Sequence, residues 1–86
     1  MSPYVNSNIE IKIFQTNTNE EWGYDILIDG NLYVHQPNVP ALSGDYGFKT
    51  ETDAQKVAQL VVGKIRNNKL PPTVSVEELE GLGVMK

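Results

Sequence analysis

The clearest pattern along the chain is the alternation of isoleucine with charged residues in segment 9–15. Successive side chains of a strand point to opposite faces, so this alternation predicts a half-buried β-strand. Two further apolar segments, 22–28 and 32–35, are joined through Asp29-Gly30, a dipeptide typical of two-residue hairpin turns. The pattern therefore predicts a three-stranded antiparallel β-meander.

The length of that turn decides which side chains of the hairpin share a face. With two turn residues, one face holds Tyr24, Ile26, Ile28, Asn31, Tyr33 and His35. The other face then holds Asp25, Leu27, Asp29, Leu32, Val34 and Gln36. A three-residue turn would exchange the faces of the returning strand, but the first arrangement is preferred because it groups the aromatic rings.

A change of period after residue 50 indicates one long helix. Its apolar stripe recurs at helical spacing and consists of Ala54, Val57, Ala58, Val61 and Ile65. Thr50 is a suitable N-cap, and Asn67-Asn68 with Pro71-Pro72 ends the helix. Gly63 lies inside the stripe-bearing segment and costs about 1 kcal/mol relative to alanine, which suggests close packing or a bend there.

A second, short helix is predicted over 75–83. Ser75 and Glu78 have the spacing of a capping box, and Gly81 or Gly83 would end the helix. The whole chain then reads as a single α+β domain over 9–86, in which the meander packs on one long α-helix and carries a short C-terminal helix. Residues 1–8 lack a pattern and are expected to form a flexible N-terminal leader.

Composition excludes several kinds of chemistry. The 86 residues carry a net charge of −4 and no cysteine, which argues against general nucleic-acid binding, disulfides and thiolate metal sites. The longest strictly apolar run is Leu60-Val61-Val62, far below the ~20 residues of a membrane helix, so no membrane insertion is expected. The single histidine and the scattered aspartates match no metal-binding spacing, and neither a metal nor a cofactor is predicted.

The connection between the hairpin and the long helix is the best candidate surface. The 35–48 loop exceeds the ~2–6 residues usual for a strand-to-helix connection and mixes turn formers with apolar residues. Aromatic rings and one imidazole lie on or near it in the sequence. The candidate ligand- or partner-binding residues are Trp22, Tyr24, Tyr33, His35, Gln36 and Tyr46.

Two motifs are the most specific in the chain, Tyr33-Val34-His35-Gln36-Pro37 and Gly47-Phe48-Lys49-Thr50. With these motifs the chain resembles a family of unknown function from Bacteroidetes, DUF4907, and the resemblance extends over nearly the whole chain after residue 8. The family has no established activity. Its members tend to begin with a hydrophobic segment, so the resemblance implies a periplasmic or cell-envelope location and a native N-terminal segment that is missing from this chain.

Three functions remain open from the sequence. The preferred one is a non-enzymatic binding domain that uses the 35–48 loop to hold a protein, small molecule or glycan. The second is an assembly domain that forms a homodimer through an edge strand or through the spare sheet face, where Leu27, Leu32 and Val34 would be exposed. The weakest is a small hydrolase or isomerase centred on His35, with Asp25 or Asp45 as the orienting acid.

Overall fold

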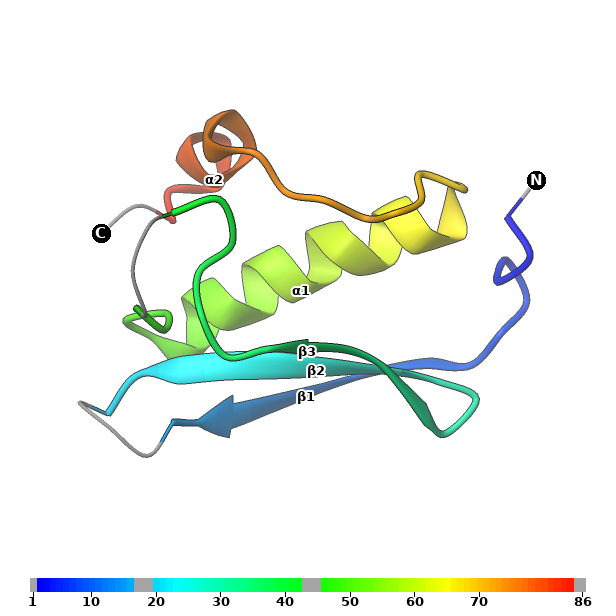
Figure 1. Cartoon of the computed structure of the whole chain (residues 1–86), viewed down its shortest axis with the longest axis horizontal. Coiled ribbons are helices and arrows are strands. Elements are labelled where there is room, and N and C mark those ends of the chain that lie inside the picture. The colour runs from blue at the N-terminus through cyan, green and yellow to red at the C-terminus, as the bar shows by residue number, and fades with distance from the viewer. Residues whose placement is uncertain (1, 17–19, 43–45, 85–86) are drawn as a thin grey trace.

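The computed structural model of the chain describes residues 2–16, 20–42 and 46–84. Three strands come first: β1 (Ile9–Gln15), β2 (Trp22–Ile28) and β3 (Asn31–Gln36). Two helices follow, α1 (Glu51–Arg66) and α2 (Val76–Leu82). Figure 1 shows α1 lying across one face of the sheet, with α2 beyond it. The predicted α+β architecture is therefore confirmed.

The sheet is an open antiparallel meander in the order β1-β2-β3. β1 and β2 pair in regular register, from Ile9 opposite Ile28 to Gln15 opposite Trp22. Asp29 and Gly30 have positive φ angles of 52° and 85°, as the two central residues of a type I′ hairpin turn require. The Asp29-Gly30 dipeptide thus sets the hairpin where the sequence places it.

The hairpin contains a β-bulge that the sequence pattern does not reveal. Next to the turn, Leu27 lies opposite Leu32, as expected. One step further, Ile26 lies opposite Val34, so Tyr33 has no partner across the strands. A bulge places one extra residue in one strand, and the residues beyond it therefore change face.

This bulge corrects the predicted facing of β3. Val34 and Gln36 lie opposite Ile26 and Tyr24 and so belong to the inner face, which packs on α1. His35 lies opposite Asp25 and therefore belongs to the outer face. The predictions that His35 shares the face of Tyr24, and that Val34 is exposed on the spare face, are wrong because they assumed unbroken pairing beyond the turn.

The helix α1 begins and ends at the predicted residues. The Thr50 hydroxyl accepts a hydrogen bond from the Asp53 backbone N–H at 3.0 Å, and Asn67 caps the other end. The predicted stripe is buried against β1 and β2. Together with Tyr24, Ile26 and Phe48, it forms the hydrophobic core of this small domain.

The short helix α2 has the predicted capping box. The Ser75 hydroxyl accepts from the Glu78 backbone N–H at 3.1 Å, while a Glu78 carboxylate oxygen accepts from the Ser75 N–H at 2.9 Å. Gly83 ends the helix in the left-handed conformation, and the fully buried Leu79 docks it. At Gly63 in α1, close packing is not observed, because an added methyl group would meet no atom within 4 Å.

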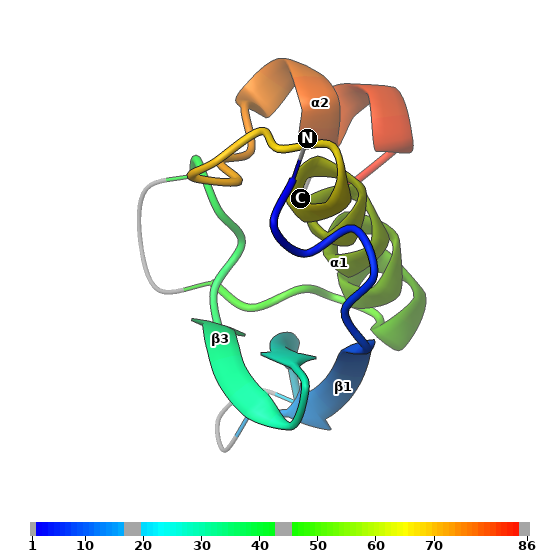
Figure 2. The same ribbon diagram turned by 90° about the vertical axis from the view of Figure 1, so that its right-hand side faces the viewer.

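The segment expected to be a flexible leader makes defined contacts over residues 2–8. Ser2 is buried, and its hydroxyl donates to the Ile65 carbonyl at 2.6 Å. Arg66 donates to the carbonyls of Tyr4, Val5 and Ser7 at 3.2–3.5 Å. Figure 2 shows this segment running beside the C-terminal end of α1. The sequence pattern does not predict this docking, because the contacts join residues about sixty positions apart.

Candidate functional site

The described parts of the connection between β3 and α1 fold back on one another. The Val39 N–H donates to the Tyr46 carbonyl at 2.7 Å. Trp22 and Phe48 exchange two backbone hydrogen bonds at 2.8 Å, which places Phe48 beside the first residue of β2. Figure 1 shows the connection rising from β3 toward α2, on the helix side of the sheet. It therefore leaves the outer face of the sheet uncovered.

A hollow of about 400 Å³ opens beside this connection; we call it the loop hollow. Its walls come from the residue before β2, the connection, the first turn of α1 and the segment after α2. They consist of Glu21, Val39, Leu42, Tyr46, Gly47, Phe48, Lys49, Asp53 and Val84. This volume lies within the ~300–1,000 Å³ range of small-molecule sites.

A backbone-to-carboxylate hydrogen bond holds the wall of the loop hollow in place. The Gly47 N–H donates to Glu21 Oε1 at 2.9 Å. A side chain at position 47 would not fit, because a Cβ there would lie 2.8 Å from the Glu21 Cβ and 3.0 Å from the Trp22 carbonyl. Glycine at 47 thus permits the close approach of the two segments that form this wall.

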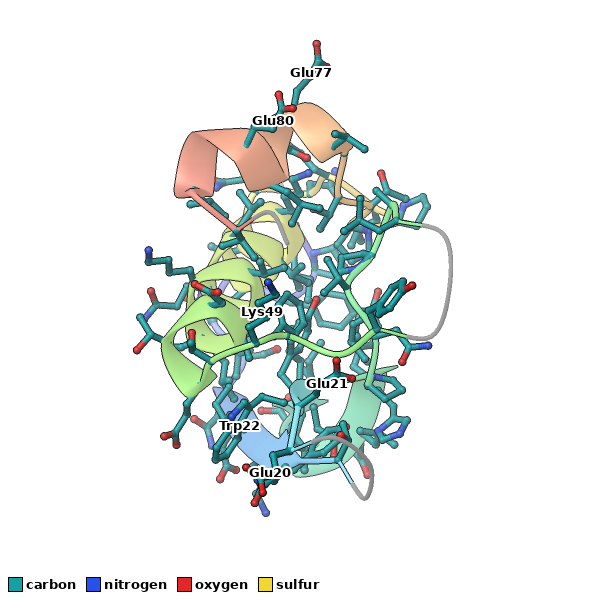
Figure 3. The ribbon with its side chains drawn as sticks, turned by 90° about the vertical axis from the view of Figure 1, so that its left-hand side faces the viewer. Glu20, Glu21, Trp22, Lys49, Glu77 and Glu80 are labelled. Atoms are coloured by element: carbon teal, nitrogen blue, oxygen red, sulfur yellow. The ribbon has the colours of Figure 1, made fainter. Side chains whose placement is uncertain are left out.

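The loop hollow combines an apolar lining with charges of both signs. Val39, Phe48 and Val84 are buried, whereas Lys49 is exposed. Figure 3 looks at this end of the molecule, with Lys49 and Glu21 near its middle and Glu77 and Glu80 projecting from α2. Such a surface suits a ligand with an apolar body and a polar or charged group, and the described residues that line it include no recognisable nucleophile–base pair.

A second hollow, of about 320 Å³, is lined by Tyr24, by Pro40 and Ala41 of the connection and by the segment before α2; we call it the Tyr24 hollow. Burial raises the pKa of the Tyr24 hydroxyl, so this group remains protonated and can act only as a hydrogen-bonding group near neutral pH. Gln36 also lines this hollow, and its amide donates to the Asn38 carbonyl at 2.6 Å. Two of the predicted site residues, Tyr24 and Gln36, therefore meet here.

The other predicted site residues do not gather into one platform. Tyr46 lines the loop hollow. Trp22 does not line it but is half-buried next to Glu21 and pairs through its backbone with Phe48, and both of those residues do line it. Tyr33 packs edge-on against Tyr4, with the ring centroids 5.5 Å apart. Burial, followed by the neighbouring Tyr4, raises the pKa of the Tyr33 hydroxyl.

His35 lies apart from both hollows, in a small cluster on the outer face. Its Nδ1 lies 2.5 Å from Asp25 Oδ1, and its ring stacks on Phe14 with the centroids 5.3 Å apart. The structure thus pairs His35 with one of the two predicted orienting acids. Neither residue lines a described hollow, and Asp45, the other predicted acid, lies outside the described residues.

The loop hollow uses residues that the sequence does not single out as site residues, notably Glu21, Lys49, Asp53 and Val84. The one available signal was the mixture of apolar and turn-forming residues in the 35–48 loop, which points to Val39 and Leu42. Within residues 2–16, 20–42 and 46–84, no three histidine, aspartate or glutamate residues gather closely enough to hold a metal ion. In the same residues, no helix is long and apolar enough to cross a membrane.

The fold and its hollows define a small two-layer α+β domain with a ligand-sized cavity beside its longest connection. Over residues 13–81 the sequence matches the model of the family described as a domain of unknown function, DUF4907. The match spans most of the chain, which therefore belongs to this family, as the sequence resemblance implied. No curated protein and no solved structure matches the chain.

Proposed function

We propose that this domain is a non-enzymatic binding module whose ligand occupies the loop hollow. The observation that carries the proposal is the hollow itself, which has a ligand-sized volume and both apolar and charged walls. The ligand would be a small amphipathic molecule or a short peptide segment. Its apolar part would contact Val39, Leu42 and Phe48, and its polar part would face Lys49 and Asp53.

The absence of catalysis in this proposal rests on the position of the one imidazole. His35 and Asp25 have the contact that a general base needs, but they lie on the open outer face and line neither the loop hollow nor the Tyr24 hollow. A catalytic base needs a bound substrate within hydrogen-bond reach. The site that suits a ligand and the group that suits catalysis are therefore in different places.

The test is chemical-shift mapping of the isotopically labelled chain against a library of small amphipathic molecules and short peptides. The expected result is a cluster of shifted amides at Val39, Leu42, Gly47, Phe48 and Lys49. Leu42→Asp would place a charge in the apolar wall and should weaken binding at least about tenfold. Leu32→Asp makes the same chemical change on the outer face and should leave binding unchanged. Shifts that cluster on the outer face instead would overturn the proposal.

A location in the cell envelope is part of the same proposal and rests on family membership. Relatives with a hydrophobic N-terminal segment would be exported, and a binding module would then meet its ligand outside the cytoplasm. Cell fractionation of the product of the complete native gene tests this point. Recovery of that product only with cytoplasmic markers would contradict the proposed location. The ligand of the loop hollow would then have to be a molecule of the cytoplasm.

A further inference from the structure

The two margins of the sheet differ in how well they are protected against pairing with another strand. The margin at β3 carries the bulge at Tyr33 and is followed by Pro37, and bulges and prolines are devices that keep an edge strand from pairing. The margin at β1 runs from Ile9 to Gln15 in regular register with neither device. Figure 2 shows β1 and β3 at these two margins.

The backbone of β1 presents unused hydrogen-bonding groups at its margin. The Asp29 N–H donates to the Asn8 carbonyl at 2.8 Å, and the Thr16 N–H donates to the Glu21 carbonyl at 2.7 Å. In an antiparallel ladder, the backbone groups of alternate residues point to the same neighbouring strand. The N–H and C=O groups of the even-numbered residues of β1 therefore point to β2. The N–H and C=O groups of Ile9, Ile11 and Ile13 therefore point away from β2, toward the open edge of the sheet, and no described residue bonds to them.

The side chains of β1 are equally incomplete. Ile9, Ile11 and Ile13 face the core but are only half-buried, because no strand lies beyond them among the described residues. Glu10 and Lys12 are exposed on the outer face, and neither has an ion-pair partner among the residues that the structure describes. A strand added at this margin would cover the isoleucines and could pair both charges.

We propose that this strand is β1 of a second copy of the chain, paired antiparallel about a twofold axis through Ile11. Ile11 would then lie opposite Ile11 of the second copy, and Ile9 opposite Ile13. These are the residues whose backbone groups point outward, so the pairing would form about six hydrogen bonds. The result is a continuous six-stranded sheet built as a homodimer.

Charge selects this register over its neighbours. With the axis at Ile11, Glu10 of each copy lies opposite Lys12 of the other, and symmetry forms this pair twice. An axis at Glu10 or at Lys12 would place two like charges directly opposite each other, which is destabilising. The segment Ile9-Glu10-Ile11-Lys12-Ile13 is therefore self-complementary in one antiparallel register.

The test uses two single charge reversals, Glu10→Lys and Lys12→Glu, examined by sedimentation equilibrium. The wild-type chain should show a reversible monomer–dimer equilibrium. Each variant alone turns both pairs repulsive, so its dissociation constant should rise at least about tenfold. An equimolar mixture should dimerise again, because the two positive side chains on β1 of the first variant then face the two negative side chains on β1 of the second.

Matched controls make the same charge changes away from β1. Glu80→Lys and Lys69→Glu lie on exposed positions and should leave the dissociation constant unchanged, alone and mixed. Unchanged circular dichroism verifies that each variant folds. A wild-type chain that stays monomeric at all concentrations would overturn the proposal, and so would a dimer that is indifferent to the charge reversals or is not restored by mixing. The loop hollow lies elsewhere, so none of these outcomes depends on the proposed ligand binding.

Discussion

The two ends of helix α1 are built in different ways. At its C-terminal end, which we call the closed end, the last carbonyls and the basic side chains have partners. Ser2 donates to the Ile65 carbonyl, and Arg66 donates to three carbonyls of the N-terminal segment. Lys64 bonds to the Thr73 carbonyl and forms a 2.7 Å ion pair with Glu78.

The N-terminal end, which we call the open end, has spare groups instead. Lys49 and Glu51 flank the start of α1, and the structure gives their side chains no partner among the described residues. The loop hollow lies at this end, with Asp53 in its wall. The Thr50 cap and the acidic groups near the helix start, which gain from the helix dipole, stabilise the open end without ion pairs to other segments of the described chain.

This contrast shows how a domain of this size can combine stability with an accessible hollow. A small core provides only modest stability, so contacts that fix chain segments matter more than in a large protein. Here most side-chain hydrogen bonds between α1 and other segments lie at the closed end, and the apolar and charged groups that could meet a ligand remain accessible at the open end. Four measurements test this contrast between the two ends.

The largest effect is expected at Ile65, which is fully buried at the closed end. Ile65→Ala removes buried methylene groups and leaves a cavity, so the free energy of unfolding should fall by about 2–5 kcal/mol. Urea denaturation monitored by circular dichroism measures this change. Leu32→Ala serves as the control, because Leu32 is 61% exposed and should change stability by less than about 0.5 kcal/mol. Equal losses in the two variants would refute the view that packing of Ile65 stabilises the closed end.

The second prediction concerns the docking of the N-terminal segment. Ser2→Ala removes the donor to the Ile65 carbonyl, so stability should fall by about 1–3 kcal/mol. Ser7→Ala changes the same side chain in the same segment but removes no described side-chain hydrogen bond, and it should have almost no effect. Hydrogen exchange of the amides at 2–8 gives a second measurement. A neutral Ser2→Ala would mean that the hydrogen bond from the Ser2 hydroxyl contributes nothing to stability.

A stabilising change is expected at Gly63, near the closed end. Gly63→Ala adds a methyl group into open space and improves helix propensity, so stability should rise by about 0.5–1 kcal/mol. Thermal unfolding should show a higher midpoint. Gly81→Ala tests the same effect in the short helix α2, where the added methyl group also meets nothing. A lower midpoint for Gly63→Ala would show that the position needs glycine for packing after all.

The smallest effect should appear as a dependence on pH. The Lys64 ammonium, followed by the Ser75 backbone N–H, holds the pKa of the Glu78 carboxyl below its ordinary value of 4.5. A lowered pKa in the folded state stabilises the fold above pH 4.5, and this contribution is lost as the pH falls through the folded value. In Lys64→Met, the free energy of unfolding should therefore fall less between neutral and acidic pH than it does in the wild type.

Lys49→Met is the matched control for this measurement, because it removes one ammonium group at the open end without touching Glu78. Urea denaturation at neutral and acidic pH measures how far the free energy of unfolding falls in acid. The fall should equal that of the wild type in Lys49→Met and should be smaller in Lys64→Met. If the two variants behave alike, the ion pair at the closed end is not the source of the acid dependence.

The elements of this fold were predictable because local signals specify them. Alternating isoleucines define β1, Asp29-Gly30 defines the hairpin turn, and Thr50 and Ser75 cap the two helices. Each signal acts within a few residues of its cause. Agreement between such local preferences and the final fold is what a foldable sequence requires.

The site was less predictable because its contacts join distant positions. The hydrogen bond from Gly47 to Glu21 crosses 26 positions, and the one from Ser2 to Ile65 crosses 63. The bulge at Tyr33 depends on the pairing between strands, and it alone moves His35 away from the face of Tyr24. Local patterns contain no information about these pairings. The sequence therefore points to the 35–48 loop as a candidate surface, but not to Glu21, Asp53 and Val84, which line the hollow beside it.

The bulge at Tyr33 also acts as a reading-frame shift for the surface of β3. Before the bulge, the even-numbered Leu32 lies on the outer face. After it, the even-numbered Val34 lies on the inner face. A substitution at Val34 therefore reports on the core, whereas one at Leu32 reports on the surface, although simple alternation makes them equivalent. Deleting Tyr33 would leave Val34 opposite Ile26 and His35 opposite Asp25, so a chain one residue shorter could keep the same two faces with unbroken pairing.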